Sequence, residues 1–135
     1  MGAGRSPYAR GMALRWGDDR REVQRLAAVL AGDAVFDSYA RQWVEDDLDR
    51  LQVSQDVFPI IVAAKSAATV GLLVGLRRRP IGYLASLLLV VYFGLAVGAH
   101  ARVRDEPLRW LPAIGMLVWC VRVHHAFRGG ELTKA

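Results

Sequence analysis

One lysine stands alone among apolar residues and is the side chain of this sequence best suited to do chemistry. Lys65 lies in the run Val57 to Leu76, which contains no other ionisable residue. An ammonium near the centre of a bilayer costs about 2.5 to 3.5 kcal/mol on insertion scales unless it is paired or hydrated. Tyr92 is as far from the turn between two apolar runs as Lys65 is, and Thr69 lies one helical turn from it. We therefore predict an intramembrane polar site of Lys65, Thr69 and Tyr92.

No acidic residue in the long apolar runs can neutralise Lys65, so its charge needs another solution. The amine can extend along its own helix toward the end near Asp56, where it meets water and headgroups. It can meet an acid on another subunit or on the N-terminal part of this chain, where Asp33 or Asp37 would pair with it if that part enters the membrane. It can also line a path for an ion or a small substrate. These three explanations stay open.

A second polar group ends the next apolar run. It consists of His100, Arg102 and Asp105. His100 with Asp105 could relay a proton or contact a quinone, because an imidazole changes its charge near neutral pH. A polar helix end beside an interfacial loop accounts for the same residues without any chemistry.

The other side chains with reactive groups do not form a site pattern. His124 and His125 are adjacent, so on a helix they point to different faces, and no Asp or Glu lies at ligand spacing from them. Cys120 is the single cysteine, which excludes an internal disulfide and a paired-cysteine metal site. No Ser-His-Asp or Cys-His arrangement and no phosphate-binding loop occurs. We expect no catalytic residue, no metal and no cofactor in this chain alone.

Long apolar helices must position these residues. The runs Val57 to Leu76 and Ile81 to Ala99 contain 20 and 19 residues, and about 20 residues cross a hydrocarbon core. The run Leu108 to Phe127 is apolar as far as Val121 and then becomes basic, so we expect it to cross with its basic end at an interface. The prediction is an all-α integral membrane protein with three transmembrane helices in a small antiparallel bundle.

Small residues recur at helical spacing in the first two runs. Such residues let membrane helices approach closely, although they are also common in membrane helices that make no contact. The residues predicted to pack helices are Ala63, Ala67, Gly71 and Gly75 in the first run, and Gly94 and Gly98 in the second.

The first 56 residues predict an amphipathic arm rather than a membrane span. Residues 19 to 31 fit a short helix that Gly32 ends, after which Asp33 caps a second helix. The second helix has one apolar stripe and a charged face that is mostly acidic. A helix that lies on lipid usually carries basic residues, so we expect docking onto protein, either a partner or the basic loop after residue 100. The residues predicted to dock are Phe36, Tyr39, Trp43, Val44 and Leu48.

Composition divides the chain into four segments and limits the classes of partner that we expect. We predict a flexible basic tail (1–18), the helical arm (19–56), the membrane bundle (57–127) and a C-terminal tail (128–135). The formal net charge is +5. In a membrane chain such a charge indicates basic loops beside headgroups and cytoplasm rather than nucleic-acid binding. We therefore expect contact with the lipid bilayer and no nucleic acid.

From about Asp47 to Asp105 the sequence resembles the DoxX-like family of small bacterial membrane proteins. The resemblance rests on Asp-Leu-Asp-Arg-Leu-Gln-Val-Ser before the first run, Val-Ala-Ala-Lys-Ser-Ala-Ala-Thr-Val-Gly-Leu-Leu-Val-Gly around Lys65, and Gly-Ala-His-Ala-Arg-Val-Arg-Asp at the end of the second. It implies a four-helix membrane bundle, and some members are linked to quinone-coupled sulfur oxidation or to complexes that handle oxidative stress. It also implies that Lys65, His100, Arg102 and Asp105 occupy family-like positions. The family's first span is absent, because residues 20 to 44 carry too many charges to insert alone.

These features lead to three functional hypotheses. The first is a non-catalytic accessory subunit that stabilises or regulates a larger membrane complex, a transporter or a respiratory assembly, with other membrane-protein subunits as partners. The alternative is a DoxX-like redox component that binds quinone. The third is a small carrier or ion pathway around Lys65. Each hypothesis expects a multi-pass protein of the bacterial plasma (inner) membrane, and the sequence does not fix its orientation.

Overall fold

All elements in the part of the chain that the structure describes, residues 7 to 128, are helices. The computed structural model contains α1 (Pro7–Tyr39), α2 (Arg41–Arg50), the short 3-10 helix η1 (Gln55–Val57), α3 (Phe58–Gly75), α4 (Arg79–Arg102) and α5 (Pro107–Arg128). The prediction of an all-α chain is confirmed. Residues 1–6 of the predicted basic tail and residues 129–135 of the predicted C-terminal tail lie outside the described residues.

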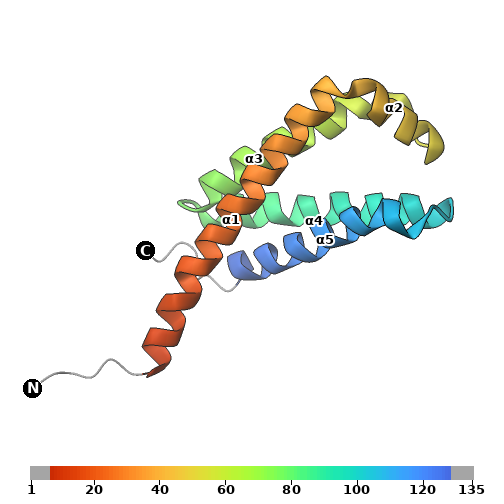
Figure 1. Cartoon of the computed structure of the whole chain (residues 1–135). Coiled ribbons are helices and arrows are strands. Elements are labelled where there is room, and N and C mark those ends of the chain that lie inside the picture. The colour runs from red at the N-terminus through yellow and green to blue at the C-terminus, as the bar shows by residue number, and fades with distance from the viewer. Residues whose placement is uncertain (1–6, 129–135) are drawn as a thin grey trace, which may run out of the picture.

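The long helices form two antiparallel pairs, α1 with α3 and α4 with α5 (Figure 1). The guanidinium of Arg20 donates to the carbonyl oxygen of Leu76, near the end of α3, whereas Asp37 lies beside Lys65 in the middle of it. These contacts show that α1 and α3 run in opposite directions. The two pairs meet near the α3–α4 turn and diverge toward α2 (Figure 1). Trp119 of α5 also donates its indole N–H to Glu22 of α1, at 2.9 Å.

Two helices are long and apolar enough to cross a membrane, the segments Gln55–Gly75 and Arg79–Arg102. They coincide with the first two predicted runs, and each has a proline in its first turn, where no backbone N–H is required. In their most apolar windows only 22% and 28% of the residues are buried within the chain. A core helix of a soluble protein would bury most of its apolar surface, so these faces fit contact with lipid. The helix α5 matches the third predicted run but does not meet the same criterion of length and composition.

The N-terminal part differs from the prediction, because α1 is one continuous helix. Gly32 does not end a helix, and Asp33 does not cap one, since both lie inside α1. Residues 7 to 18, which were predicted to form a flexible tail, are helical as well. A glycine in a helix interior costs about 1 kcal/mol relative to alanine. The packing of Leu26 and Leu30 of α1, neither of which is exposed to solvent, outweighs this cost.

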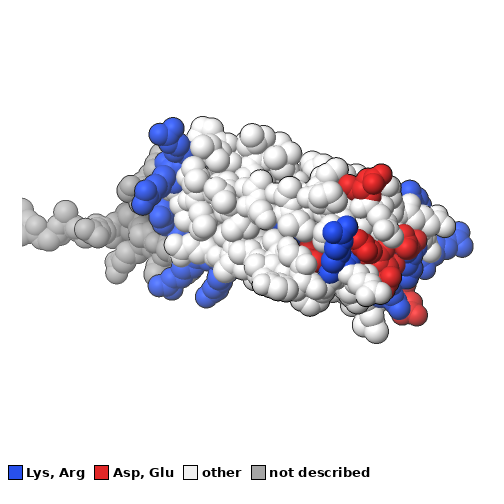
Figure 2. Space-filling model, turned by 90° about the horizontal axis from the view of Figure 1, so that it is seen from above, with Lys and Arg blue, Asp and Glu red and all other residues white. Residues whose placement is uncertain are grey.

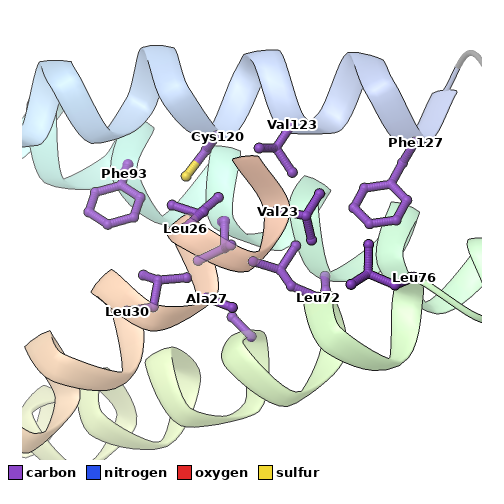
Figure 3. Packing of buried hydrophobic residues seen from close by; sticks show 13 residues of the cluster. Val23, Leu26, Ala27, Leu30, Leu72, Leu76, Phe93, Cys120, Val123 and Phe127 are labelled. Atoms are coloured by element: carbon purple, nitrogen blue, oxygen red, sulfur yellow. The ribbon is translucent and has the colours of Figure 1, made fainter. Parts of the chain in front are cut away.

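The main core joins α1, α3, α4 and α5 near the α3–α4 turn. Leu26 and Leu30 of α1 pack with Leu72 of α3, Phe93 of α4 and Cys120 of α5 (Figure 3). Both helix pairs are therefore clamped together at this end. A second, smaller cluster lies at the other end and holds α2 onto the start of α3 through Val44, Leu48 and Phe58.

Two glycines allow α3 and α4 to approach closely. A Cβ on Gly75 would overlap the backbone of Gly82, and a Cβ on Gly82 would overlap the ring of Phe127. At Gly71 a Cβ would lie 2.8 Å from that of Ala85. The other residues of the predicted packing stripes behave differently. Ala63 and Ala67 are exposed, and a Cβ on Gly94 or Gly98 would have nothing within 4 Å among the described residues.

Candidate functional site

Lys65 lies between two carboxylates of α1. Its Nζ is 2.5 Å from Oδ2 of Asp37 and 2.7 Å from Oδ2 of Asp33. The two acids are four residues apart, so they project from the same face of the helix. The side chains of Lys65 and Asp37 are 9% and 6% exposed, whereas that of Asp33 is 40% exposed. Three explanations were left open for the charge of Lys65. The structure agrees with the one in which acids on the N-terminal part of the chain pair with it.

The two neutral residues predicted beside Lys65 lie near it in different ways. Tyr92 of α4 lines the same cavity as Lys65, and its ring packs at right angles on Phe93 with 5.0 Å between centroids. Thr69 donates its hydroxyl to the backbone carbonyl of Lys65 at 2.9 Å, one turn back along α3. Thr69 thus bonds the helix backbone, and the ammonium itself is held by Asp33 and Asp37.

A cavity of about 610 Å³ separates the two helix pairs on the side where they diverge. Its wall is mostly apolar and includes Ile61 of α3, Phe93 of α4 and Met116 of α5. The Lys65 cluster forms a charged patch in this wall, halfway along α3. Small-molecule sites are typically concave and apolar with a few well-placed polar groups, and this cavity has both properties.

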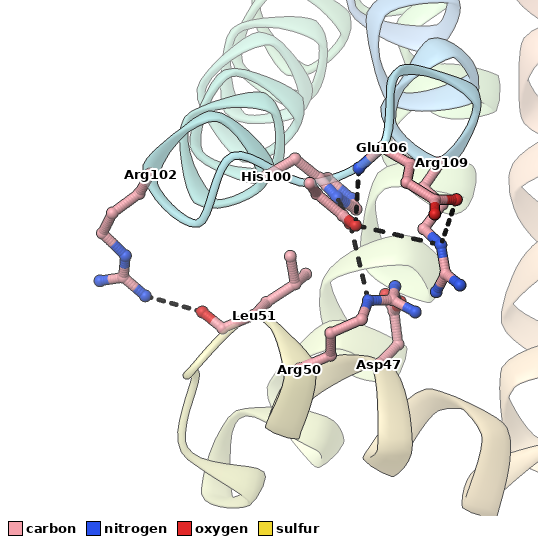
Figure 4. Close-up of polar contacts among 8 residues, drawn as sticks. Asp47, Arg50, Leu51, His100, Arg102, Glu106 and Arg109 are labelled. Carbon is pink, nitrogen blue, oxygen red and sulfur yellow. Dashed lines mark hydrogen bonds and ion pairs between the residues drawn. The ribbon is translucent and has the colours of Figure 1, made fainter.

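The cavity ends at a polar cluster that ties α2 to the α4–α5 loop (Figure 4). Nδ1 of His100 is 2.8 Å from the Asp105 carboxylate, which also lies 3.6 Å from Nε of Arg50 and 3.9 Å from Nε of Arg109. Arg102 donates to the backbone carbonyl of Leu51 at 2.8 Å. Of the residues that resemble the family motif, His100 and Asp105 therefore contact each other, whereas Arg102 lies apart from them and bonds the end of α2 (Figure 4).

The residues predicted to dock onto a partner fall into two groups. Val44 and Leu48 are buried within the chain. Phe36, Tyr39 and Trp43 are 52%, 90% and 63% exposed. These residues therefore do not form the single docking face that was expected. The helix breaks between Tyr39 and Arg41, and across this break the rings of Phe36 and Trp43 contact each other, with 6.0 Å between centroids.

Asp37 is buried on the side of α1 that faces α3. The i, i+4 spacing of Asp33 and Asp37 was a readable signal, because it puts two acids on one helix face. The sequence did not show which residues of α1 lie opposite which residues of α3.

The two C-terminal histidines point in different directions. His124 lies 3.0 Å from the Ser86 hydroxyl through Nδ1 and packs its ring on Tyr83 with 4.7 Å between centroids. His125 is exposed. His124 thus contacts α4 and takes part in helix packing.

Comparison with known proteins identifies one family. A model of the DoxX-like family matches residues 24–122. The match begins inside α1 and ends inside α5, so it covers more of the chain than the sequence motifs did. No curated protein and no solved structure matches the chain.

Proposed function

Because the chain belongs to the DoxX-like family and is a membrane protein, we propose that it binds a lipid-soluble molecule with a polar group in the cavity beside Lys65. The observation that carries the proposal is the ion-paired cluster in the wall of a largely apolar cavity. Ionisable residues at membrane depth are costly, and where they face a cavity they commonly mark the path or site of a substrate.

The proposal includes four membrane crossings, by α1, α3, α4 and α5. The charges of Asp33 and Asp37 are directed at Lys65, and residues 26 to 40 contain no other charged side chain. These 15 residues span about 22 Å, and the long side chain of Arg25 can extend the crossing by reaching toward headgroups. Such a helix is too polar to insert alone but can cross when α3 shelters its acids. The bundle would then match the four-helix arrangement that the family resemblance implies.

The charge distribution supports one orientation for this bundle. Figure 2 shows basic side chains at one end, an uncharged middle and mixed charges at the other end. Basic residues collect where α1 enters, at the α3–α4 turn and where α5 ends: Arg20, Arg21, Arg77, Arg78, Arg79, Arg122 and Arg128. The positive-inside rule favours the cytoplasm for this end. In this proposal the protein is a multi-pass protein of the bacterial plasma membrane whose cavity lies nearer the outer side.

Binding of small probes tests the proposal. Purified protein in lipid nanodiscs is titrated with three lipid-soluble probes: the cation tetraphenylphosphonium, the anion tetraphenylborate and the neutral decylubiquinone. We expect saturable binding of at least one probe at one site per chain. The variant Ala96→Trp fills the cavity and should remove this binding, because Ala96 lines it. Leu88→Trp places the same side chain on an exposed face of α4 and should leave binding unchanged. If no probe binds saturably, the proposal fails.

The quinone and carrier hypotheses use this same cavity. His100 lines it, as the quinone hypothesis requires, but its Nδ1 already contacts Asp105. Lys65 lines it as well, which the carrier hypothesis requires. Binding of decylubiquinone alone would favour the first of these, and transport of a bound probe into liposomes would favour the second.

An accessory role in a larger complex is a second candidate, and the exposed Phe36, Tyr39 and Trp43 favour it. Two other features do not require a partner subunit. Lys65 pairs with acids of its own chain, and α2 contacts the α4–α5 loop of the same chain. Mild-detergent purification from the native host distinguishes the two candidates. A stable heteromeric assembly that is lost in the Trp43→Ser variant would support the accessory role, whereas a lone chain would exclude it.

A further inference from the structure

We propose that the occupant of the cavity is a cation with an apolar body, and that the Asp33 carboxylate holds its charge. This inference rests on the proposed function, since it names the class of molecule that the cavity takes.

The charges around Lys65 do not balance. One ammonium faces two carboxylates, those of Asp33 and Asp37. Asp37 has the shorter contact and the more buried side chain, so the Lys65–Asp37 pair accounts for the positive charge. Asp33 is then the surplus negative charge, and its 40% exposed side chain lines the cavity.

The other charged residues of the wall have opposite charges beside them. Asp47 forms an ion pair with Arg50, and Arg109 lies 3.5 Å from a carboxylate oxygen of Glu106. Asp33 and Asp37 share Lys65 as their recorded ion-pair partner, and Asp33 is the more exposed of the two, with 40% against 6% of its side chain accessible. A carboxylate in this position attracts a positive charge more strongly than it would in water, because the surrounding dielectric constant is low.

The rest of the cavity wall suits an apolar or aromatic body attached to that charge. Aromatic side chains come from α2 and α4, namely Trp43, Tyr92 and Phe93. Aromatic ring faces attract cations within about 6 Å of the ring centroid. Aliphatic residues supply most of the remaining surface, so a hydrophobic ammonium or phosphonium ion would find both a counter-charge and apolar contacts. An anion would instead face Asp33, and the Lys and Arg cations of the described wall, Lys65 and Arg109, already have carboxylates beside them.

The charge of the probe decides the question with the wild-type protein. Tetraphenylphosphonium and tetraphenylborate have nearly the same shape and opposite charge. In nanodiscs, after subtraction of binding to empty nanodiscs, we expect saturable binding of the phosphonium and none of the borate. Both ions partition into lipid, so Ala96→Trp serves as the control for binding outside the cavity.

Variants of Asp33 identify the group responsible. Asp33→Asn should weaken phosphonium binding by about tenfold or more, because it removes a charge from a poorly hydrated site. Asp33→Glu keeps the charge and should retain binding. Asp46→Asn, at an exposed acid of α2 outside the cavity wall, should have no effect.

Each outcome bears on a different statement. If the borate or decylubiquinone binds saturably and the phosphonium does not, the cation inference is overturned. The proposed function would still stand. Phosphonium binding that persists unchanged in a folded Asp33→Asn protein would also overturn the cation inference. Absence of saturable binding by all three probes would defeat both. If Asp33→Asn does not fold, the comparison of the two ions on wild-type protein still decides.

Discussion

Lys65 is tolerated inside an apolar helix because two acids of another helix surround it. Lys65 and Asp37 are both nearly inaccessible, so each is a charge that the other must compensate. Breaking a buried pair by removing one partner typically costs about 3 to 5 kcal/mol, while replacing both partners by apolar residues is often neutral. The pair therefore fixes how α1 sits on α3, and its removal should be felt as a loss of stability.

We predict that Lys65→Met lowers the free energy of unfolding by about 3 kcal/mol or more, because Asp37 is left buried without a cation. The double variant Lys65→Met with Asp37→Leu should recover much of the loss. Unfolding by denaturant in detergent micelles measures both. Thr69→Val, which removes only a bond to the backbone of the same helix, is the control. Equal stability of wild type and Lys65→Met would show that the pair is not formed.

At the scale of elements, close contact between α3 and α4 depends on a few glycines. Gly75 and Gly82 face each other, and Phe127 of α5 fills the space that a side chain on Gly82 would need. The small residues nearer the other end do not have this role within the chain. A Cβ on Gly94 would meet no other atom within 4 Å among the described residues.

Two alanine substitutions separate these environments. Gly75→Ala should destabilise the protein by about 1 to 3 kcal/mol, because the added Cβ meets the backbone of Gly82, which cannot move aside as a side chain could. Gly94→Ala should stabilise it by up to about 1 kcal/mol through better helix propensity. Unfolding midpoints of both variants test this. A destabilised Gly94→Ala would mean that the face around Gly94 is occupied.

At the scale of the whole molecule, one end is basic and the other carries mixed charges (Figure 2), and two acids of α1, Asp33 and Asp37, face Lys65 of α3. In the proposed arrangement α1 crosses the membrane because the carboxylates in the apolar part of this helix, those of Asp33 and Asp37, meet Lys65. The basic residues at the start of α1 then lie on the same side as the α3–α4 turn. In the proposed orientation these basic residues face the cytoplasm, as the positive-inside rule favours.

Labelling of single cysteines tests this topology in intact cells. In a Cys120→Ala background, Gln42→Cys and Glu106→Cys should react with an impermeant maleimide from outside. Arg21→Cys and His125→Cys should react only after the membrane is made permeable. All four positions are exposed in the structure. Labelling of Arg21→Cys and Gln42→Cys from the same side would show that α1 does not cross.

The sequence by itself determined the helical class, the two most apolar spans and the presence of an unusual charge at Lys65. It could do so because these features depend on composition and spacing along one segment, such as the uninterrupted apolar residues on both sides of Lys65. Its motifs also indicated the DoxX-like family. The extent of α1 was misread at Gly32 because a local helix-ending signal was outweighed by packing of Leu26 and Leu30.

Only the tertiary structure decided which acids meet Lys65, where the cavity lies and which small residues pack. Each of these depends on the register between helices that are distant in sequence. The contact between Asp37 and Lys65 joins residues 28 positions apart, and the bond from Arg102 to Leu51 joins residues 51 apart. Periodicity within a helix says which face a residue lies on, but not which other helix covers that face. That choice is made by the packing of the whole chain.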